Sequence, residues 1–479
     1  MKTLQAPAVP SHWPALVAGD TSHDEPIGVL WAQYGPYHFA RFAALAELAA
    51  PTRVHALEIA NLSRDYLWSR AQKEFEIATL CPGARTEDLP FKLVFKQARR
   101  KLAELGIQVC LLPSYSPRQS VAVLFAAKSL GIRTVMMNES HAGTARATGA
   151  SAFAKRRLVR LFDAALVGGQ PHRQYFASLG MPEERIFTGY DAVDNDYFSQ
   201  NADAVREMPS DYRARYRLPA HFFLSLGRFV AKKNLATLIW AYRIFLDASS
   251  TKQSHLVLVG AGDEEPNLRR VARELHLPVY QKSTVQSPQS SARIVGCAER
   301  SGHGSESHKP KIEDPPPGVH FYGFRQIEEN PVFYGLADGF VLPSSSEEWG
   351  LVVNEAMASG LPVIVSDRAG CAEDLMEPGW PAVPESAASE LHQRLGRIKG
   401  AICRNGFLFD PASAEGLAGA LLALEAVPPM RRAMGQASRR IVARFSCRNF
   451  AENALQAVRA ALNHADPAPA LGRALAPVS

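Results

Sequence analysis

Glu347 and Glu355 stand eight positions apart, on either side of a Trp-Gly-Leu turn, in the segment SSSEEWGLVVNEAMASGLPVIVSDRAGCAED. Carboxylates accept hydrogen bonds from neutral hydroxyl groups such as those of sugars. The backbone amides of residues 350–352, at the start of a predicted helix, favour an anion such as a phosphate. Carboxylates that bind hydroxyls beside amides that bind phosphates indicate a site for a nucleotide sugar.

The elements around these glutamates follow from the local pattern. An apolar run of strand length, Gly339–Pro343, precedes them, and Leu351–Ser359 is predicted to be a helix that ends at Gly360. A second strand, Pro362–Ser366, follows. This strand–loop–helix order puts Glu347 at the carboxyl end of a strand, with the other glutamate in the second helical turn.

A second cluster lies in SLGRFVAKKNLATLI, where Arg228 and Lys233 are five residues apart in the loop after a predicted strand. Breaking a glycosidic bond to a diphosphate leaves negative charge on the departing group, and cations at that place stabilise it. Lys232 is the neighbouring alternative. A basic turn that is simply solvated is the other interpretation.

The glutamate segment closely resembles the E-x7-E signature of the retaining glycosyltransferase family 4, including its EAMA-x-G-x-PVI run. Glu348 stands where that family usually has glycine. The resemblance implies a GT-B fold, which is an α/β architecture of two facing Rossmann-like domains with parallel sheets and an interdomain cleft. It also implies a nucleotide-sugar-dependent hexosyltransferase that needs neither cofactor nor metal, with the nucleotide sugar as co-substrate.

The same resemblance assigns site residues. The stretch VHFYGFRQ is similar to the segment whose backbone meets the nucleobase in that family. The expected donor-binding residues are Gly35, Arg228, Lys233, Gly323, Phe324, Arg325, Glu347, Gly350, Leu351, Val352 and Glu355. The expected catalytic residues are Arg228, Lys233, Glu347 and His141.

The acceptor is expected to bind the first domain. Tyr37 and His38 follow the first predicted strand, after Gly35, and the cluster Asn138-Glu139-Ser140-His141 follows a later one. Related enzymes often have a functional histidine there. Asn138 fits best by strand position and His141 is the nearest histidine, so that register stays open. The acceptor-side residues are therefore Tyr37, His38, Glu139 and His141.

Strand and helix patterns alternate over residues 27–190 and again over 221–445, which predicts two parallel sheets covered on both faces. A polar, turn-rich joint is expected over 191–220, and a helix over 446–463. Segments 281–317 and 378–403 are expected to be insertions. Residues 1–26 are predicted to be a flexible extension and 464–479 a disordered tail.

Composition excludes several classes. A net charge of +6 over 479 residues, with no aromatic-interleaved basic stripe, does not indicate nucleic acid. Six scattered cysteines predict reduced thiols. No apolar run has transmembrane length and no signal peptide is evident, so a cytoplasmic location is expected.

Four other patterns were weighed. Asp194-Asn195-Asp196 matches a metal-binding D-x-D, but its place in the joint favours a structural role. Gly260-Ala-Gly262 lacks the third glycine of a dinucleotide site and is expected to be a structural turn. His303 and His308 lie in an unpatterned polar segment. Arg156, Arg157 and Arg160 share one face of a predicted helix, which is either a solvated basic face or a contact with anionic lipid.

Together these patterns predict a retaining hexosyltransferase that moves a sugar from a nucleoside diphosphate to a glycan or lipid-linked acceptor, in surface or extracellular polysaccharide assembly. A nucleotide-sugar epimerase with the same fold and a non-catalytic sugar-nucleotide-binding homologue are the alternatives. The donor base, the sugar and the acceptor are left open.

Overall fold

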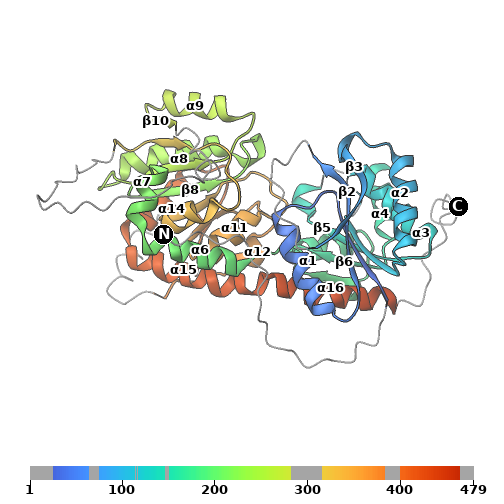
Figure 1. The fold of residues 1–479 in the computed structure, drawn as a ribbon. Coiled ribbons are helices and arrows are strands. Elements are labelled where there is room, and N and C mark those ends of the chain that lie inside the picture. The colour runs from blue at the N-terminus through green and yellow to red at the C-terminus, as the bar shows by residue number, and fades with distance from the viewer. Residues whose placement is uncertain are drawn as a thin grey trace, which may run out of the picture.

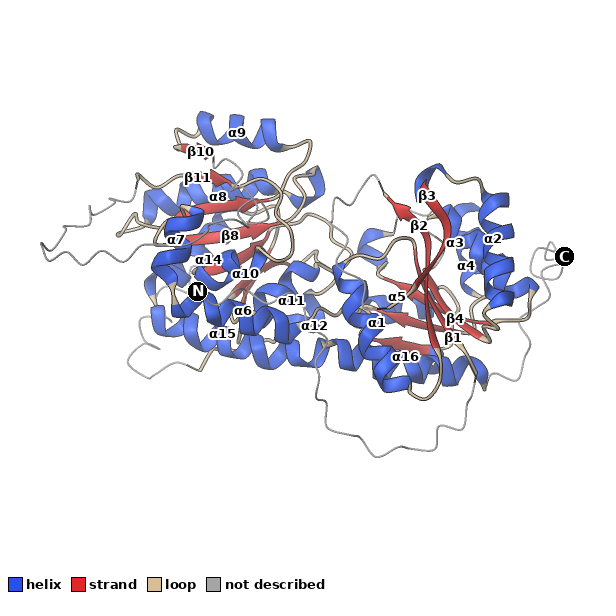
Figure 2. Cartoon of the chain, in the orientation of Figure 1, coloured by secondary structure: helices blue, strands red, loops and turns tan. Residues whose placement is uncertain are grey.

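The computed structural model describes residues 25–63, 75–113, 115, 117–145, 150–281, 315–382 and 400–463. The chain forms two α/β domains side by side, each built on a parallel sheet with helices on both faces (Figures 1 and 2). The predicted fold class is therefore confirmed at the level of two parallel-sheet domains.

The first domain has seven parallel strands in the order β3-β2-β1-β4-β5-β6-β7. Side chains alternate across the sheet: Val29 and Trp31 of β1 pack on one face and Leu30 on the other. Both faces are buried, as expected for a parallel sheet. The strands are β1 Ile27–Trp31, β2 Val54–Leu62, β3 Ile77–Arg85, β4 Val109–Pro113, β5 Arg133–Asn138, β6 Ala164–Val167 and β7 Ile186–Thr188.

Helices α2, α3, α4 and α5 bury side chains in the core on one face of this sheet, and α1 covers the other face. Short 3-10 turns η1 (Thr86–Asp88), η2 (Ala142–Thr144) and η3 (Glu183–Arg185) lie between the main elements. The helices are α1 Pro36–Ala49, α2 Phe91–Glu104, α3 Arg118–Ser129, α4 Ala150–Val159 and α5 Gln170–Ser178.

The second domain has eight strands in the order β10-β11-β9-β8-β12-β13-β15-β14. The pairs are parallel except at the edge, where β14 runs antiparallel to β15. The strands are β8 Phe222–Leu226, β9 His255–Val259, β10 Val279–Gln281, β11 Val319–Phe321, β12 Gly339–Leu342, β13 Val363–Ser366, β14 Gly400–Cys403 and β15 Gly406–Phe409.

Its helices also form two layers with separate cores. One layer comprises α8 Leu235–Ala248, α9 Glu265–Glu274 and α14 Ala414–Ala426. The other comprises α6 Asn195–Glu207, α7 Pro209–Tyr216, α10 Asn330–Leu336, α11 Leu351–Ala358, α12 Ala372–Leu375 and α15 Pro428–Val442. The second domain also contains the 3-10 turns η4 (Ala231–Lys233) and η6 (Ala443–Phe445).

The last helix, α16 (Cys447–Leu462), returns to the first domain. Its apolar side chains, among them Phe450, Ala454 and Val458, share a core with β1 and α1. Ser446 caps its start, since the hydroxyl accepts from the Asn449 amide at 3.2 Å. The first domain is thus closed by the last of the described helices, seen in red along its lower edge in Figure 1.

The fold differs from the prediction between the domains and in strands that were not expected. The segment 191–220 was expected to be turn-rich, yet it holds α6 and α7, and α6 packs on α10 and α11 of the second domain. Tyr197, Phe198, Ala202 and Val205 form the buried face of α6, which the surrounding polar residues concealed. Strands β3 and β10 were not predicted.

Other predictions fall outside the described residues. These are the expectations for 1–24, for 464–479, for His303 and His308, and for most of the two insertions, over 282–314 and 383–399. The end of the second insertion, 400–403, is the edge strand β14. Within the described part of the chain, no helix combines the length and apolarity needed to cross a bilayer. The five cysteines among the described residues are free thiols.

Candidate active site

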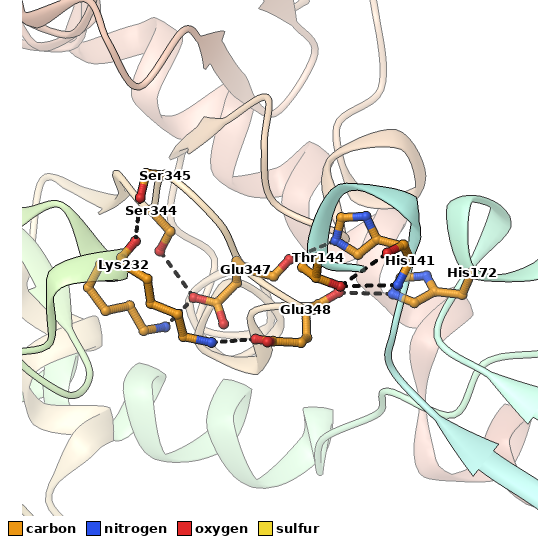
Figure 3. A network of polar contacts seen from close by, with 9 residues as sticks. His141, Thr144, His172, Lys232, Ser344, Ser345, Glu347 and Glu348 are labelled. Atoms are coloured by element: carbon orange, nitrogen blue, oxygen red, sulfur yellow. Dashed lines mark hydrogen bonds and ion pairs between the residues drawn. The ribbon is translucent and has the colours of Figure 1, made fainter. Parts of the chain in front are cut away.

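The two predicted clusters meet at the carboxyl ends of the second domain's strands. Glu347, in the loop between β12 and α11, forms an ion pair with Lys233 of η4 and accepts a hydrogen bond from Ser344 Oγ at 3.0 Å. The next residue, Glu348, pairs with Lys232 at 2.5 Å (Figure 3). Two adjacent lysines thus face two adjacent glutamates. Lys233 and Glu347 are the more buried pair, with side chains 14% and 9% exposed.

The backbone of the same loop is bound by two histidines from the first domain (Figure 3). His141 Nε2 lies 3.0 Å from the Glu347 carbonyl oxygen, and His172 Nε2 lies 2.9 Å from that of Glu348. The Nδ1 atom of each ring accepts from a backbone amide, Gly143 N at 3.2 Å and Gly169 N at 3.1 Å. Nε2 must then carry the proton and donate to the loop.

Glu355 lies eight residues on, in α11, and is fully buried. The hydroxyl of Tyr37, from the first domain, donates to Glu355 Oε1, and Asn330 Nδ2 lies 3.5 Å from Oε2. Burial raises the pKa of this carboxyl to about 7, although the hydrogen bond from Tyr37 opposes the shift. Tyr37, predicted on the acceptor side, therefore contacts a residue predicted to bind the donor.

This buried carboxyl predicts a pH dependence of stability. Its pKa rises from a reference of 4.5 to about 7 on folding, so the folded state holds the proton more tightly. The resulting stabilisation is complete below the unfolded pKa and is lost as pH rises through about 7. Glu355→Gln stays neutral, so its free energy of unfolding should decline less between pH 5 and 8 in denaturant titrations.

The control for this experiment is Glu184→Gln, because Glu184 is exposed on η3. It should reproduce the wild-type profile. A Glu355→Gln profile parallel to that of the wild type would contradict the proposed titration.

The loop that carries Arg228, Lys232 and Lys233 packs against the turn Gly260-Ala-Gly262, which was predicted to be structural. Gly260 and Gly262 have φ of 142° and 157°. A Cβ on Gly260 would lie 1.8 Å from the Gly227 carbonyl oxygen, and one on Gly262 would lie 2.3 Å from that of Phe229. Only glycine permits this approach, which fixes the backbone on both sides of Arg228. The Arg228 side chain itself is exposed.

The segment predicted to meet a nucleobase follows β11. Gly323 has φ of 69°, and Phe324 is 36% exposed. Arg325 is buried, donates to the Tyr322 carbonyl at 3.2 Å and pairs with Glu329 at 3.3 Å. The guanidinium of Arg325 therefore braces its own turn.

Gly350, Leu351 and Val352 are at the start of α11, as predicted. Gly350 is the N-cap residue, with φ of 106°, and a Cβ there would meet Leu342 Cδ2 at 2.9 Å. The first amides of a helix have no intrahelical acceptor, so they remain suited to an anion.

The histidine of the first loop is turned toward its own helix. His38 Nδ1 accepts from Gly35 N at 3.0 Å, and its ring stacks on Trp31 with centroids 4.6 Å apart. Burial, aided by the charge of Arg41, lowers the His38 pKa to about 3. The ring is thus neutral and holds the start of α1.

A buried carboxyl pair lies behind the loop. Asp191 is fully buried and lies 3.8 Å from Arg41 Nη2. Burial raises the pKa of both Asp191 and Glu139, and the Glu139 charge raises that of Asp191 further, while Arg41 opposes both shifts. Both carboxyls therefore hold a proton to higher pH than they would in water. Glu139, predicted on the acceptor side, lies within electrostatic reach of Glu347 and Glu348.

The Asp194-Asn195-Asp196 pattern has a structural role. Asp194 caps α6, because its Oδ1 accepts from Tyr197 N at 2.9 Å, and Asn195 Nδ2 donates to the Val442 carbonyl at 3.0 Å. Among the residues that the structure describes, no three His, Cys, Asp or Glu side chains are grouped as they would be around a metal ion.

His172 was missed, although the sequence carried a signal for it. Gly35-Pro36-Tyr37-His38 and Gly169-Gln170-Pro171-His172 are both G-x-x-H at a helix start, with proline in the first turn. In both, the histidine at the third helical position accepts from the amide of the glycine N-cap. This is one half of a capping box, the bond from the N-cap amide to the third helical residue, with histidine in place of glutamate.

Comparison with known proteins agrees with this geometry. Residues 279–441, from β10 to α15, match the family model described as Glycosyl transferases group 1. Residues 279–441 are therefore similar to the group 1 glycosyl transferases, and the two-domain architecture is the GT-B fold. Both the predicted family resemblance and the predicted fold are confirmed at this level.

Two characterised relatives match part of the chain. Mannosylfructose-phosphate synthase of Agrobacterium fabrum is 29% identical over 182 residues, which is 38% of this chain and 32% of that protein. Sulfoquinovosyl transferase SQD2 of Arabidopsis thaliana is 34% identical over 128 residues, which is 27% of this chain and 21% of that protein. The matches thus span about a third or less of each relative.

Solved structures match over nearly the whole chain. Sucrose-phosphate synthase from Thermosynechococcus elongatus superposes with a TM-score of 0.59 at 18% identity, covering 91% of this chain and 98% of its own. Alr3699/HepE of Anabaena in complex with UDP-glucose gives 0.60 at 15% identity, covering 91% and 99%. These proteins share the fold.

Proposed function

We propose that this chain is a retaining hexosyltransferase, which moves a hexose from a nucleoside-diphosphate sugar to a glycan or lipid-linked acceptor in surface or extracellular polysaccharide assembly. The observation that carries the proposal is the meeting of Lys232 and Lys233 with Glu347 and Glu348 beside the start of α11. Cations and helix amides suit a diphosphate, and the carboxylates suit sugar hydroxyls.

The comparisons support the donor class. Alr3699/HepE was solved with UDP and with UDP-glucose, and an α,α-trehalose-phosphate synthase from Burkholderia xenovorans was solved with glucose-6-phosphate. Both share this fold with TM-scores of 0.58 to 0.60. The names of the characterised relatives likewise describe a sugar-phosphate synthase and a sulfoquinovosyl transferase.

In the proposed mechanism the donor diphosphate displaces Glu347 from Lys233. The ammonium group then faces the phosphate oxygens, where charge accumulates as the glycosidic bond breaks. The released carboxylate accepts hydrogen bonds from the sugar ring, and Glu355 accepts from hydroxyls elsewhere on the donor. Arg228, exposed on the same loop, closes over the diphosphate.

Retention is proposed to follow from attack on the face from which the diphosphate leaves. The leaving phosphate takes the proton of the acceptor hydroxyl, so the bond from C1 to the acceptor oxygen forms as the bond to the diphosphate breaks. Arg228, Lys232 and Lys233 supply positive charge at the leaving group, so we propose that transfer needs no metal.

The test begins with a thermal-shift screen of UDP-, GDP- and ADP-sugars, because a ligand that binds the folded state raises Tm. The stabilising donor is then incubated with candidate acceptors, with and without EDTA. Acceptor-dependent release of nucleoside diphosphate, unchanged by EDTA, is expected. Interconversion of the donor sugar without such release would indicate the epimerase, and binding without turnover would indicate a non-catalytic homologue.

A lipid-linked acceptor would bring the first domain to a membrane surface, and α4 offers a basic face for it. Arg156 and Arg160 are exposed, and Phe153, 58% exposed, lies under the Arg157 guanidinium at 5.0 Å. An exposed aromatic ring among arginines suits the interface of an anionic bilayer. We propose this contact as peripheral, at the cytoplasmic face.

Changing Arg156, Arg157 and Arg160 together to glutamine should abolish sedimentation with vesicles that contain phosphatidylserine, because each cation near such a surface contributes on the order of 1 kcal/mol. Wild-type binding should weaken as salt rises. Activity on a short water-soluble acceptor should persist. Equal sedimentation of the variant and the wild type would remove the membrane contact.

A further inference from the structure

The loop 344–350 is held by both domains at once. Its two glutamate side chains are paired with Lys232 and Lys233 of the second domain. The carbonyl oxygens of the same two residues accept from His141 and His172 of the first domain. The side chains of Glu347 and Glu348 therefore contact the second domain, while the backbone of the same two residues contacts the first domain (Figure 3).

His172 is fixed in the form that this contact needs. Burial lowers its pKa to about 4, so the ring is neutral near pH 7. Its Nδ1 accepts from Gly169 N at 3.1 Å, which leaves the proton on Nε2, facing the loop. The ring is buried and packs against Trp349, with ring centroids 5.6 Å apart.

A third contact comes from the same helix start. Both carboxylate oxygens of Asp374, in α12 of the second domain, accept from Gln170 N, at 3.2 and 3.0 Å. A Cβ on Gly169 would lie 1.9 Å from Asp374 Oδ2. The start of α5 is therefore held against both the glutamate loop and the element that follows β13.

We propose that His141 and His172 are positioning residues, which couple the approach of the two domains to the placement of Glu347 and Glu348. When the domains separate, both histidine contacts are lost together, and the loop keeps only its contacts within the second domain, among them the lysine pairs and the bond from Gly370 N to the Glu347 carbonyl. The donor then meets a loop whose two carbonyls lack their contacts with the first domain. Its apparent affinity falls with the fraction of molecules in the closed arrangement.

This inference rests on the proposed function of the site, and its test separates the two hydrogen bonds of the His172 ring. The amide oxygen of asparagine can take the place of Nδ1, which preserves the bond from the glycine amide. It has no donor at the position of Nε2. The amide nitrogen of glutamine can take that position. His172→Asn thus removes the contact between the ring and the Glu348 carbonyl, and His172→Gln keeps it.

For the His172→Asn variant we expect the donor KM to rise about five- to tenfold, which is the effect of losing one hydrogen bond of ordinary strength. Its kcat should stay within about threefold, because saturating donor restores closure. The His172→Gln variant should keep both constants within about threefold. A merely structural role would instead lower Tm in both variants and leave KM of the folded molecules unchanged.

A second measurement does not depend on turnover. Small-angle scattering of the ligand-free protein should give a larger radius of gyration for the asparagine variant than for the wild type or the glutamine variant. Binding of UDP, GDP and ADP, each tested separately by calorimetry, should weaken in the same order. If the wild type transfers no sugar, the proposed function fails, and scattering still decides the coupling. A folded asparagine variant with wild-type radius and affinity would overturn it.

Discussion

Lys233→Ala should lower kcat by about two to three orders of magnitude with the true donor and acceptor, the range found when one preorganised charge-stabilising donor is removed. Lys233 is largely buried against Glu347 beside the start of α11. Its interaction with a departing diphosphate would strengthen as charge develops, so the loss falls on kcat more than on KM. Steady-state kinetics with the donor varied measures this division.

The matched control is Lys232→Ala, which removes the neighbouring ammonium from a more exposed pair, 30% and 42% exposed. We expect a smaller loss of kcat from it. A larger effect at Lys232 would exchange the roles of the two lysines.

Glu347→Ala should also lower kcat and should reduce the discrimination between sugars carried by the same nucleotide. Near wild-type turnover in both Lys233→Ala and Glu347→Ala would refute the site.

Gly370→Ala should reduce kcat/KM by about a hundredfold or more, because a displacement of about 1 Å at a catalytic loop can have that effect. Gly370 N donates to the Glu347 carbonyl at 3.0 Å. A Cβ on Gly370 would lie 1.9 Å from the Glu348 carbonyl oxygen and 3.1 Å from His141 Cδ2. The first contact is with backbone, so the glutamate loop itself must move.

Arg368→Ala serves as the control, since Arg368 is in the same loop as Gly370, between β13 and α12, and its side chain is 67% exposed. It should retain activity near that of the wild type. Circular dichroism and Tm of both variants show whether Gly370→Ala remains folded. A folded Gly370→Ala enzyme with wild-type kcat/KM would mean that the loop's position does not govern the reaction.

The glutamate segment could be predicted closely because its information is local. The expected strand over Gly339–Pro343 is β12, Gly339–Leu342, and the expected helix over Leu351–Ser359 is α11, Leu351–Ala358. Apolar runs and glycine stops set these boundaries within one residue. The pairing of Lys233 with Glu347 follows, because parallel strands bring their following loops to one edge of the sheet.

Elements without local signals were missed. Strand β3 contains Pro82 and Gly83, which are typical of a turn, and it forms a strand because β2 pairs with it along one side. Helix α6 follows a polar, aspartate-rich stretch, and its buried face is recognisable once α10 and α11 are known to cover it. In both cases tertiary contacts decide the structure.

The histidine contacts were beyond prediction for a different reason. His141 and His172 bind carbonyl oxygens, and every residue has one, so no residue type in the loop marks the partner. The turning of Arg325 toward its own segment is equally invisible in a motif. A sequence indicates which side chains carry chemistry more readily than which way they face.

Because α16 returns to the first domain, the described part of the chain crosses between the domains twice. The first crossing follows β7 and the second precedes α16, and the two are joined by a parallel bridge between Val193 and Ser446. A single connection would let one domain twist in any direction relative to the other. Two connections that are bonded to each other let the two domains bend about one line and restrict their twisting. The first domain can then approach the glutamate loop along a single path, and His141 and His172 meet the same two carbonyls each time.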